Sequence, residues 1–220
     1  MLPGMALSGW AAVSVKSAIA KASRIRPSSG MCGAEAAARI LAAEGLQHVA
    51  IEQTRGMLGD HYDPRKKVLR LTPEIYQGRT LAAVGIAAHE AGHAIQDAHA
   101  YAPLAIRNKL VPMASVGSSL SWVMLIGGFV LQSQSLIFAG IALFSVTVVF
   151  QLINLPVEFN ASTRAREVLV NNSIVMRNEL APVSKVLNAA AMTYVAATIT
   201  AVLQLLYFLY RSGLLGGSRN

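Results

Sequence analysis

The stretch His89-Glu90-Ala91-Gly92-His93 decides how the rest of this chain is to be interpreted. On a helix, residues four apart are separated by about 40° around the axis, so His89 and His93 share a face and both imidazoles can reach one metal ion. Glu90 is the next residue around the helix and is close enough to act on a metal-bound water. This H-E-x-x-H pattern is typical of zinc hydrolases. Catalytic zinc takes three protein ligands and keeps one open position, so a third ligand must come from elsewhere.

The alternative is a buried, alanine-rich helix whose histidines only satisfy hydrogen bonds of the core. Residues 81–88 before the motif are all apolar, and Ala-Ile-Gln-Asp follows at 94–97. A helix that is apolar nearly all round is buried. Two histidines and a carboxylate inside such a helix need a partner. We therefore predict one Zn²⁺ per chain.

The composition predicts a membrane protein. Of the 220 residues, 54% are apolar and only 14% are charged, whereas about 25% of a soluble chain is charged. The net charge of +8 fits loops that face anionic lipid. No basic stretch is interleaved with aromatic residues, so no nucleic-acid partner is expected. Cys32 is the single cysteine, which excludes a disulfide framework and a cysteine-based zinc site.

Three uncharged runs are long enough to cross a bilayer. Residues 111–131 and 136–155 are separated only by Gln132–Ser135, and each run reaches roughly 30 Å as a helix, the hydrocarbon thickness. They predict a transmembrane hairpin. Val186–Tyr210 is a third candidate span, with Tyr194 among the tyrosines suited to the membrane interface. The alternative, three buried helices of a soluble bundle, is disfavoured because little amphipathic sequence remains to cover them.

The N-terminal segment leaves three interpretations open. Met1–Val15 is apolar but shorter than the roughly 20 residues that a spanning helix needs. It is an interfacial helix, the tail of a longer anchor that begins upstream, or, least favoured, a signal peptide. The basic residues 16–26 are expected at a membrane surface.

Between this segment and the first span, the sequence predicts a small zincin-like part. Gly33–Glu44 is predicted to be a helix that ends at Gly45. Thr72 followed by Pro73 predicts the start of another helix, and Thr80 is the expected N-cap of the motif helix. Leu46–Gln53 and Val68–Leu71 read as strands of a β-hairpin beside that helix, with a turn at 61–65.

The predicted fold class is therefore a mainly α membrane protein, with a zincin-like helix core, a small β-hairpin, a transmembrane hairpin and one further transmembrane helix. The predicted segments are an N-terminal membrane-associated part at 1–26, a zincin-like part at 27–109, a transmembrane hairpin at 110–155, a membrane-proximal segment at 156–185, a transmembrane helix at 186–210 and a tail at 211–220.

The basic residues predict the topology. Of 19 Lys and Arg, 13 precede residue 111 and four lie between Arg164 and Lys185, while the hairpin tip has none. The positive-inside rule then places the motif helix and residues 156–185 in the cytoplasm. We expect a multi-pass protein of the cell (inner) membrane whose active site faces the cytoplasm.

Glu158 is the candidate third ligand. It lies just past the second span, on the same predicted side as the motif helix. A carboxylate there can complete an H-E-x-x-H site. From its position alone, Glu158 could equally be a surface residue that caps the start of a helix.

Five stretches of the chain resemble the bacterial neutral zinc metallopeptidases of the YugP type, which are small membrane-bound proteases. The similarity extends from about Ser28 to Tyr210. These proteases are more distantly similar to the membrane gluzincins, which include the CAAX prenyl proteases and the heat-shock membrane protease. The stretches are Asp60-His-Tyr-Asp-Pro-Arg65, Val68-Leu-Arg-Leu71, Ala87-Ala-His-Glu-Ala-Gly-His-Ala-Ile-Gln-Asp97, Tyr101-Ala-Pro-Leu104 and Leu155-Pro-Val-Glu-Phe-Asn-Ala-Ser-Thr-Arg-Ala165.

The resemblance implies that His89, His93 and Glu158 bind zinc and that Glu90 is the catalytic residue. Two features depart from the family pattern. Asn160 stands where the family usually has Asp, and the chain shows only Met1–Val15 where the family has a full first span. The first departure touches no ligand, and the second leaves the N-terminal topology open.

The predicted activity is that of an endopeptidase acting on protein or peptide substrates. Glu90 would take a proton from a zinc-activated water and pass it to the leaving amine, while the strand Val68–Leu71 pairs with an extended substrate. Asp97, one turn beyond His93, is a candidate acceptor for a hydrogen bond from a ligand imidazole. Further candidates for supporting the ligands are Ser162 and Arg164, and those for stabilising the oxyanion are His61, Tyr62, His99 and Tyr101.

Two other functions compete with this one. A site-2-type intramembrane metalloprotease would place the motif within a full apolar span and use an Asp from another span, but polar Gln96 and Asp97 follow the motif soon after and no Asp occurs from 98 to 220. A catalytically inactive scaffold would keep zinc for stability alone, against which the intact Glu90 argues. The lipid bilayer is an expected partner, and the sequence predicts no particular oligomeric state.

Overall fold

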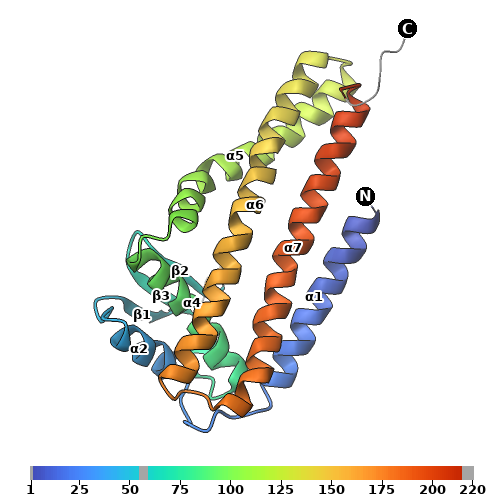
Figure 1. Cartoon of the computed structure of the whole chain (residues 1–220). Coiled ribbons are helices and arrows are strands. Elements are labelled where there is room, and N and C mark those ends of the chain that lie inside the picture. The colour runs from blue at the N-terminus through green and yellow to red at the C-terminus, as the bar shows by residue number, and fades with distance from the viewer. Residues whose placement is uncertain (1, 55–58, 215–220) are drawn as a thin grey trace.

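The computed structural model describes residues 2–54 and 59–214. Its long helices run alongside one another in an elongated bundle (Figure 1). Helix α5 packs on α6, α6 on α7, and α7 on α1. Among the described residues, α5, α6 and the stretch Arg177–Arg211 are long and apolar enough to cross a membrane. The predicted fold class, a mainly helical chain with a small sheet and three candidate membrane-spanning helices, is confirmed. The four helices are α1 (Leu2–Ala22), α5 (Ala102–Val130), α6 (Gln134–Asn171) and α7 (Leu180–Arg211).

The apolar and basic parts of the N-terminal segment form one helix. Helix α1 continues from Leu2 to Ala22 without a break at Lys16. It lies along the lower part of α7 (Figure 1), where the Thr200 hydroxyl donates to the carbonyl of Gly4 over 3.3 Å. The segment is thus anchored on α7 by helix packing.

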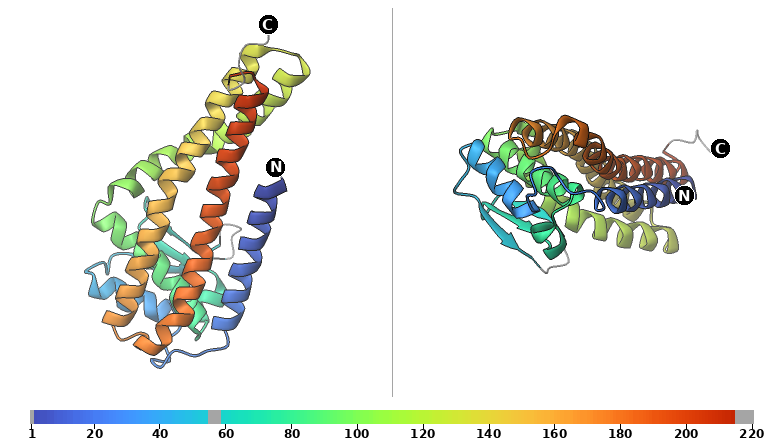
Figure 2. Two further views of the ribbon diagram at one scale, coloured as in Figure 1. Left: turned by 45° about the vertical axis from the view of Figure 1, so that its right-hand side comes forward. Right: turned by 90° about the horizontal axis from the view of Figure 1, so that it is seen from below.

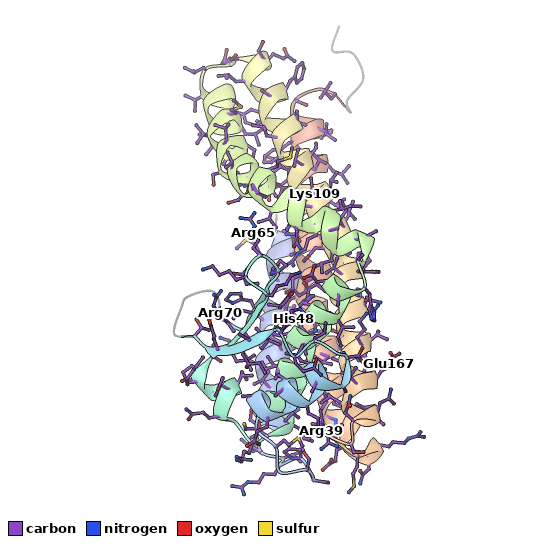
Figure 3. The ribbon with its side chains drawn as sticks, turned by 90° about the vertical axis from the view of Figure 1, so that its left-hand side faces the viewer. Arg39, His48, Arg65, Arg70, Lys109 and Glu167 are labelled. Carbon is purple, nitrogen blue, oxygen red and sulfur yellow. The ribbon has the colours of Figure 1, made fainter. Side chains whose placement is uncertain are left out.

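The remaining elements gather on one side of the lower half of the molecule (Figure 2). We call residues 23–108 and 156–193 the lower half, and residues 109–155 and 194–214 the upper half. All six residues that Figure 3 labels, among them Arg39, Arg70 and Glu167, lie in the lower half or, in the case of Lys109, at its border. The shorter elements are helices α2 (Gly33–Ala43), α3 (Pro73–Gln77) and α4 (Leu81–Ala98), the 3₁₀ turn η1 (Arg177–Glu179), and strands β1 (Ala50–Gln53), β2 (His61–Asp63) and β3 (Val68–Leu71).

The predicted helix ends are correct. Gly45 follows the last residues of α2 with a φ of 72°, the left-handed conformation that glycine adopts without strain. Thr80 Oγ1 accepts from the backbone N–H of Ala83 over 3.2 Å and caps α4. Thr72 is the N-cap of α3 with Pro73 behind it, although its hydroxyl donates to Asp60.

The sheet corrects the predicted strand pairing. Its order is β1-β3-β2, and β1 runs parallel to β3, so residues 46–53 and 68–71 do not form a hairpin. The hairpin is made by β2 and β3, which are antiparallel. Residues 61–63, predicted as part of a turn, are therefore an edge strand. β1 and β3 are neighbours in the sheet although β2 lies between them in the sequence. Such a pairing depends on long-range packing, which local sequence patterns do not encode.

Helix α4 is the buried centre of the lower half. Ala87, Ala88 and Ala91 are fully buried, as predicted for an apolar helix. Helices α4 and α6 approach each other closely at Gly92, because a Cβ at this position would lie 2.8 Å from the carbonyl oxygen of Ala161. This contact brings the motif and the residues after the second span together.

Two boundaries differ from the sequence interpretation. Helix α6 continues from Gln134 to Asn171, so Glu158 lies in the interior of a helix and the alternative that it caps a helix start is wrong. The beginning of the third predicted span belongs to the core of the lower half, because Val186 and Leu187 are buried against residues of α4. At 25 residues, that run is longer than a bilayer requires, and its first turns pack on protein.

Candidate metal centre

Three side chains that can bind a metal ion converge between α4 and α6. The potential ligand atoms of His89, His93 and Glu158 all lie within 4.8 Å of one another. Glu158 Oε2 is 3.2 Å from His89 Nε2 and 3.8 Å from His93 Nε2. The two histidines are one turn apart on α4, and Glu158 follows His89 by 69 residues and reaches it from α6. Two nitrogens and one carboxylate oxygen therefore point toward one position.

Burial controls the protonation of these groups. Burial, followed by the charge of His89, lowers the pKa of His93 to about 4, so its imidazole is neutral at pH 7, the form that binds metals. Burial also raises the pKa of Glu90 to about 7, although His89 opposes this. For His89 itself, burial favours the neutral form, but the hydrogen bond to Glu158 and the charge of Glu90 outweigh it and raise the pKa.

The far nitrogen of each imidazole has a partner that fixes its ring. His93 Nδ1 lies 2.9 Å from Gln96 Oε1, and Gln96 Nε2 donates to the carbonyl of Val157 over 2.8 Å. His89 Nδ1 lies 3.2 Å from the hydroxyl of Ser162. Fixing the far nitrogen of a ligand histidine sets its tautomer and its orientation. The structure thus gives Ser162 the contact expected of it and assigns the role expected of Asp97 to Gln96.

Asp97 instead accepts hydrogen bonds from outside the helix. The hydroxyl of Tyr62 donates to Asp97 Oδ2 over 2.7 Å, and Lys67 forms an ion pair with the same oxygen. Burial, followed by the hydrogen bond to Asp97, raises the pKa of Tyr62, whose phenol stays protonated. Its backbone N–H donates to Glu90 Oε2 over 3.1 Å. The sheet therefore holds the motif carboxylate in place through Tyr62.

Asn160 and Arg164 form the outer part of the network. Asn160 Oδ1 accepts from Gln96 Nε2 and from Arg164 Nε, both over 2.9 Å. An amide oxygen accepts these bonds as a carboxylate oxygen would, which explains how Asn replaces the Asp expected from the resemblance. Arg164 also lies 3.1 Å from His99 Nδ1. Both residues thus lie one contact further from the metal position than Gln96.

A cavity of about 110 Å³ opens beside the three ligands. His61 and Tyr62 contribute to its wall, whereas the other oxyanion candidates, His99 and Tyr101, are not among its lining residues. The lining residues are Asp60, His61, Tyr62, Pro64, His89, Glu90, His93, Leu104, Arg107, Asn108, Glu158 and Tyr194.

Arg107 and Tyr194 are site residues that sequence reasoning missed. Arg107 Nη2 lies 3.9 Å from Glu158 Oε1, and its Nε is buried without a hydrogen-bond partner in the described part of the chain. Tyr194 was expected at the membrane interface because it lies in the third uncharged run, but it lines the cavity. The one available signal was the position of Arg107 directly before the first span.

The donor set fits a zinc ion. Two imidazoles and a glutamate, with space for a fourth ligand, form a recognised arrangement for catalytic zinc. Glu158 is only 2% exposed, and a carboxylate buried this deeply requires a cation beside it. Arg107 lies on the side of Glu158 Oε1, and a metal ion at the position shared with His89 and His93 would supply a second cation on the side of Oε2.

Comparisons with known proteins match the chain over a length that includes both α4 and α6, the two helices that carry the candidate ligands. The sequence model of the family described as "Putative neutral zinc metallopeptidase" matches residues 1–213. A protein of Bacillus subtilis (strain 168), described as "Putative membrane protease YugP", is 46% identical over 207 residues, which cover 94% of this chain and 92% of that protein. No solved structure matches the chain.

Proposed function

This chain belongs to the neutral zinc metallopeptidase family, and from that premise we propose that it is a membrane-bound endopeptidase. It hydrolyses peptide bonds with one zinc ion held by His89, His93 and Glu158, and Glu90 is the general base. The observation that carries this proposal is the convergence of these ligands from α4 and α6 within 4.8 Å, with Glu90 in the same cavity.

Glu90 is positioned to move protons. When bound, zinc supplies a water of lowered pKa and polarises the substrate carbonyl. Because Glu90 Oε2 accepts from the Tyr62 N–H, Oε1 is the oxygen that takes the proton from water and later gives it to the leaving nitrogen. Burial raises the pKa of Glu90, which helps a carboxylate to hold the proton it has accepted until it passes it on.

Arg107 and Tyr194 stabilise the negative charge that develops on the carbonyl oxygen. Both line the cavity on the side of α5 and α7, facing the ligands on α4 and α6. Arg107 Nη2 lies 3.9 Å from Glu158 Oε1, so its guanidinium group brings a positive charge to the cavity wall beside the metal position. A donor fixed before the reaction begins lowers the barrier without reorganising.

The substrate backbone is held by β2. The strand proposed from sequence, Val68–Leu71, has neighbours on both sides and has no free edge. Tyr62 on β2 directs its N–H toward Glu90, so this edge of the sheet faces the cavity. An extended peptide that pairs with this edge lies across the metal position.

The structure argues against a site-2-type arrangement. The motif helix α4 is buried in the lower half and is not among the three candidate spans found in residues 2–54 and 59–214. An inactive zinc scaffold is the remaining alternative, and activity distinguishes it.

The test is hydrolysis of an unstructured protein such as casein by the zinc-loaded chain in detergent. Glu90→Gln keeps the size and hydrogen-bonding capacity of the side chain but removes the base, so we expect a rate lower by a factor of about 10²–10⁴ with zinc content unchanged. Wild-type activity in this variant would identify another base or a structural zinc. Loss of zinc would show that Glu90 supports the architecture of the site.

We also propose that the lower half faces the cytoplasm of a cell whose inner membrane the protein crosses several times. Seventeen of the 19 basic residues precede residue 111 or lie between 164 and 185. In a Cys32→Ser background, Ser133→Cys should react with an impermeant maleimide in intact cells, and Arg65→Cys only after permeabilisation. The reverse pattern would invert the topology.

A further inference from the structure

Three aromatic rings mark one level in the upper half. Trp122 of α5, Phe144 of α6 and Phe208 of α7 contact one another edge to face, with ring centroids 5.5 to 6.4 Å apart. Because each ring comes from a different helix, the cluster aligns the three helices along their axes. Depth along one helix can therefore be compared with depth along another.

The cluster lies midway along both arms of the predicted transmembrane hairpin. Trp122 is 11 residues after Val111, and Phe144 is 11 residues before Leu155. Eleven residues of helix span about 16 Å, which is close to half of the roughly 30 Å hydrocarbon thickness. On α7, Phe208 lies two residues before Tyr210, the end of the third run, so the two hairpin runs, and not α7, define the hydrocarbon layer.

The candidate metal centre lies just outside the hydrocarbon layer. Fourteen residues separate Phe144 from Glu158, and 14 separate Phe208 from Tyr194. Both intervals correspond to about 21 Å along the helix, so the two cavity residues share one depth. Glu158 lies three residues after Leu155 and Arg107 lies four residues before Val111, which places both about 5–6 Å outside the ends of the hairpin runs, and the headgroup region on each side is about 5–7 Å thick. A helix tilt of about 20° shortens these distances by less than a tenth.

On the basis of the function proposed above, we propose that the substrates are membrane-anchored proteins cleaved in the segment that leaves the bilayer. The cavity opens at the level of the lipid headgroups, and a chain emerging from a transmembrane helix crosses this level within its first few residues. Anchoring in the same bilayer also raises the effective concentration of such a segment. A soluble chain has neither advantage.

The experiment uses the zinc-loaded full chain in liposomes with three single-span substrates that carry the same unstructured casein segment. The segment follows the span directly, after ten Gly/Ser residues, or after ten prolines. Ten prolines form a stiff spacer of about 31 Å, which lifts the segment beyond the cavity, whereas the flexible spacer allows it to fold back. We expect similar rates for the first two substrates and a rate at least tenfold lower for the third.

A fourth substrate controls for the polyproline itself, with the ten prolines placed after the casein segment instead of before it. It should be cleaved as fast as the substrate without a spacer. Equal cleavage of the proline-spaced substrate would overturn the proposal while leaving the peptidase function intact. If the wild type cleaves none of the four any faster than Glu90→Gln does, the peptidase function fails, and this proposal fails with it.

Discussion

The two halves of the molecule differ in how their buried polar side chains are paired. In the lower half, Gln96, Glu158 and Ser162 are buried and each has a polar partner. Among the described residues, the buried side-chain atoms without a hydrogen-bond partner are Thr147 Oγ1, Asn154 Oδ1 and Gln204 Nε2 in the upper half and Arg107 Nε, at the wall of the cavity, in the lower half. A buried group without a partner is costly, so the network in the lower half is what holds a site in one geometry, and the upper half has no such network.

The exposed surfaces differ in the same way. Val116, Val123 and Val130 on α5 are 67–75% exposed, whereas Leu81, Val84 and Ile95 on α4 are buried. The lower half is stabilised by removing apolar surface from water. The upper half keeps apolar surface outside, which is stable only where the surroundings are hydrocarbon. One chain is thus built for two solvents, and the site forms where they meet.

The largest effect should follow removal of a ligand. His89→Ala, His93→Ala and Glu158→Ala each remove one of three donors, and each should lower zinc affinity by more than the factor of about 10–100 typical of changes around a site. Thr147→Val in the upper half should keep close to one zinc per chain. Metal analysis of the purified proteins measures both. Full zinc content in Glu158→Ala would show that the third ligand is another residue.

A smaller effect should separate Gln96 from Gln204. Gln96→Leu removes the partner of His93 Nδ1 and should weaken zinc binding by about 10–100-fold, measured by competition with a chromophoric chelator. Gln204→Leu removes a buried amide nitrogen that has no partner and should leave stability unchanged or raise it. An equal loss of zinc affinity in Gln96→Leu and Gln204→Leu would mean that the buried amides of the two halves do not differ in their effect on the site.

The smallest effect concerns helix packing. Gly92→Ala forces a Cβ against the Ala161 carbonyl and should lower the free energy of unfolding by about 1–3 kcal/mol, with weaker zinc binding because α4 and α6 move apart. Gly127→Ala on α5 meets nothing within 4 Å and should be neutral or slightly stabilising. Denaturant unfolding in detergent compares them. A neutral Gly92→Ala would show that α6 can shift without cost.

Local chemistry made most of the fold predictable. The caps at Thr72 and Thr80, the end of α2 at Gly45, and the uncharged runs depend on neighbours in sequence, and the structure places each as expected. The parallel pairing of β1 with β3 was missed because it depends on contacts between distant segments. Features that form only when distant segments of the chain come together, such as this strand pairing, could not be predicted from local sequence patterns.

The same distinction holds for the candidate site. The spacing of His89, Glu90 and His93 determines their shared face, and Ser162 follows Glu158 by one turn. Gln96 and Asp97 both follow His93 closely, so periodicity alone did not show which side chain turns toward the imidazole. Tyr194 was expected at the membrane interface and Arg107 was not singled out, since only the alignment of α5, α6 and α7 brings them to one cavity.

The delivery of Glu158 by α6 has a consequence for biogenesis. His89 leaves the ribosome 69 residues before Glu158, and the entire α5–α6 hairpin is synthesised between them. The metal site therefore stays incomplete until both arms of the hairpin have been threaded into the bilayer and α6 has returned to α4. A chain in which α6 has not yet packed on α4 brings together only two of the three candidate ligands, so assembly of the α5–α6 hairpin against α4 is a precondition for metal binding.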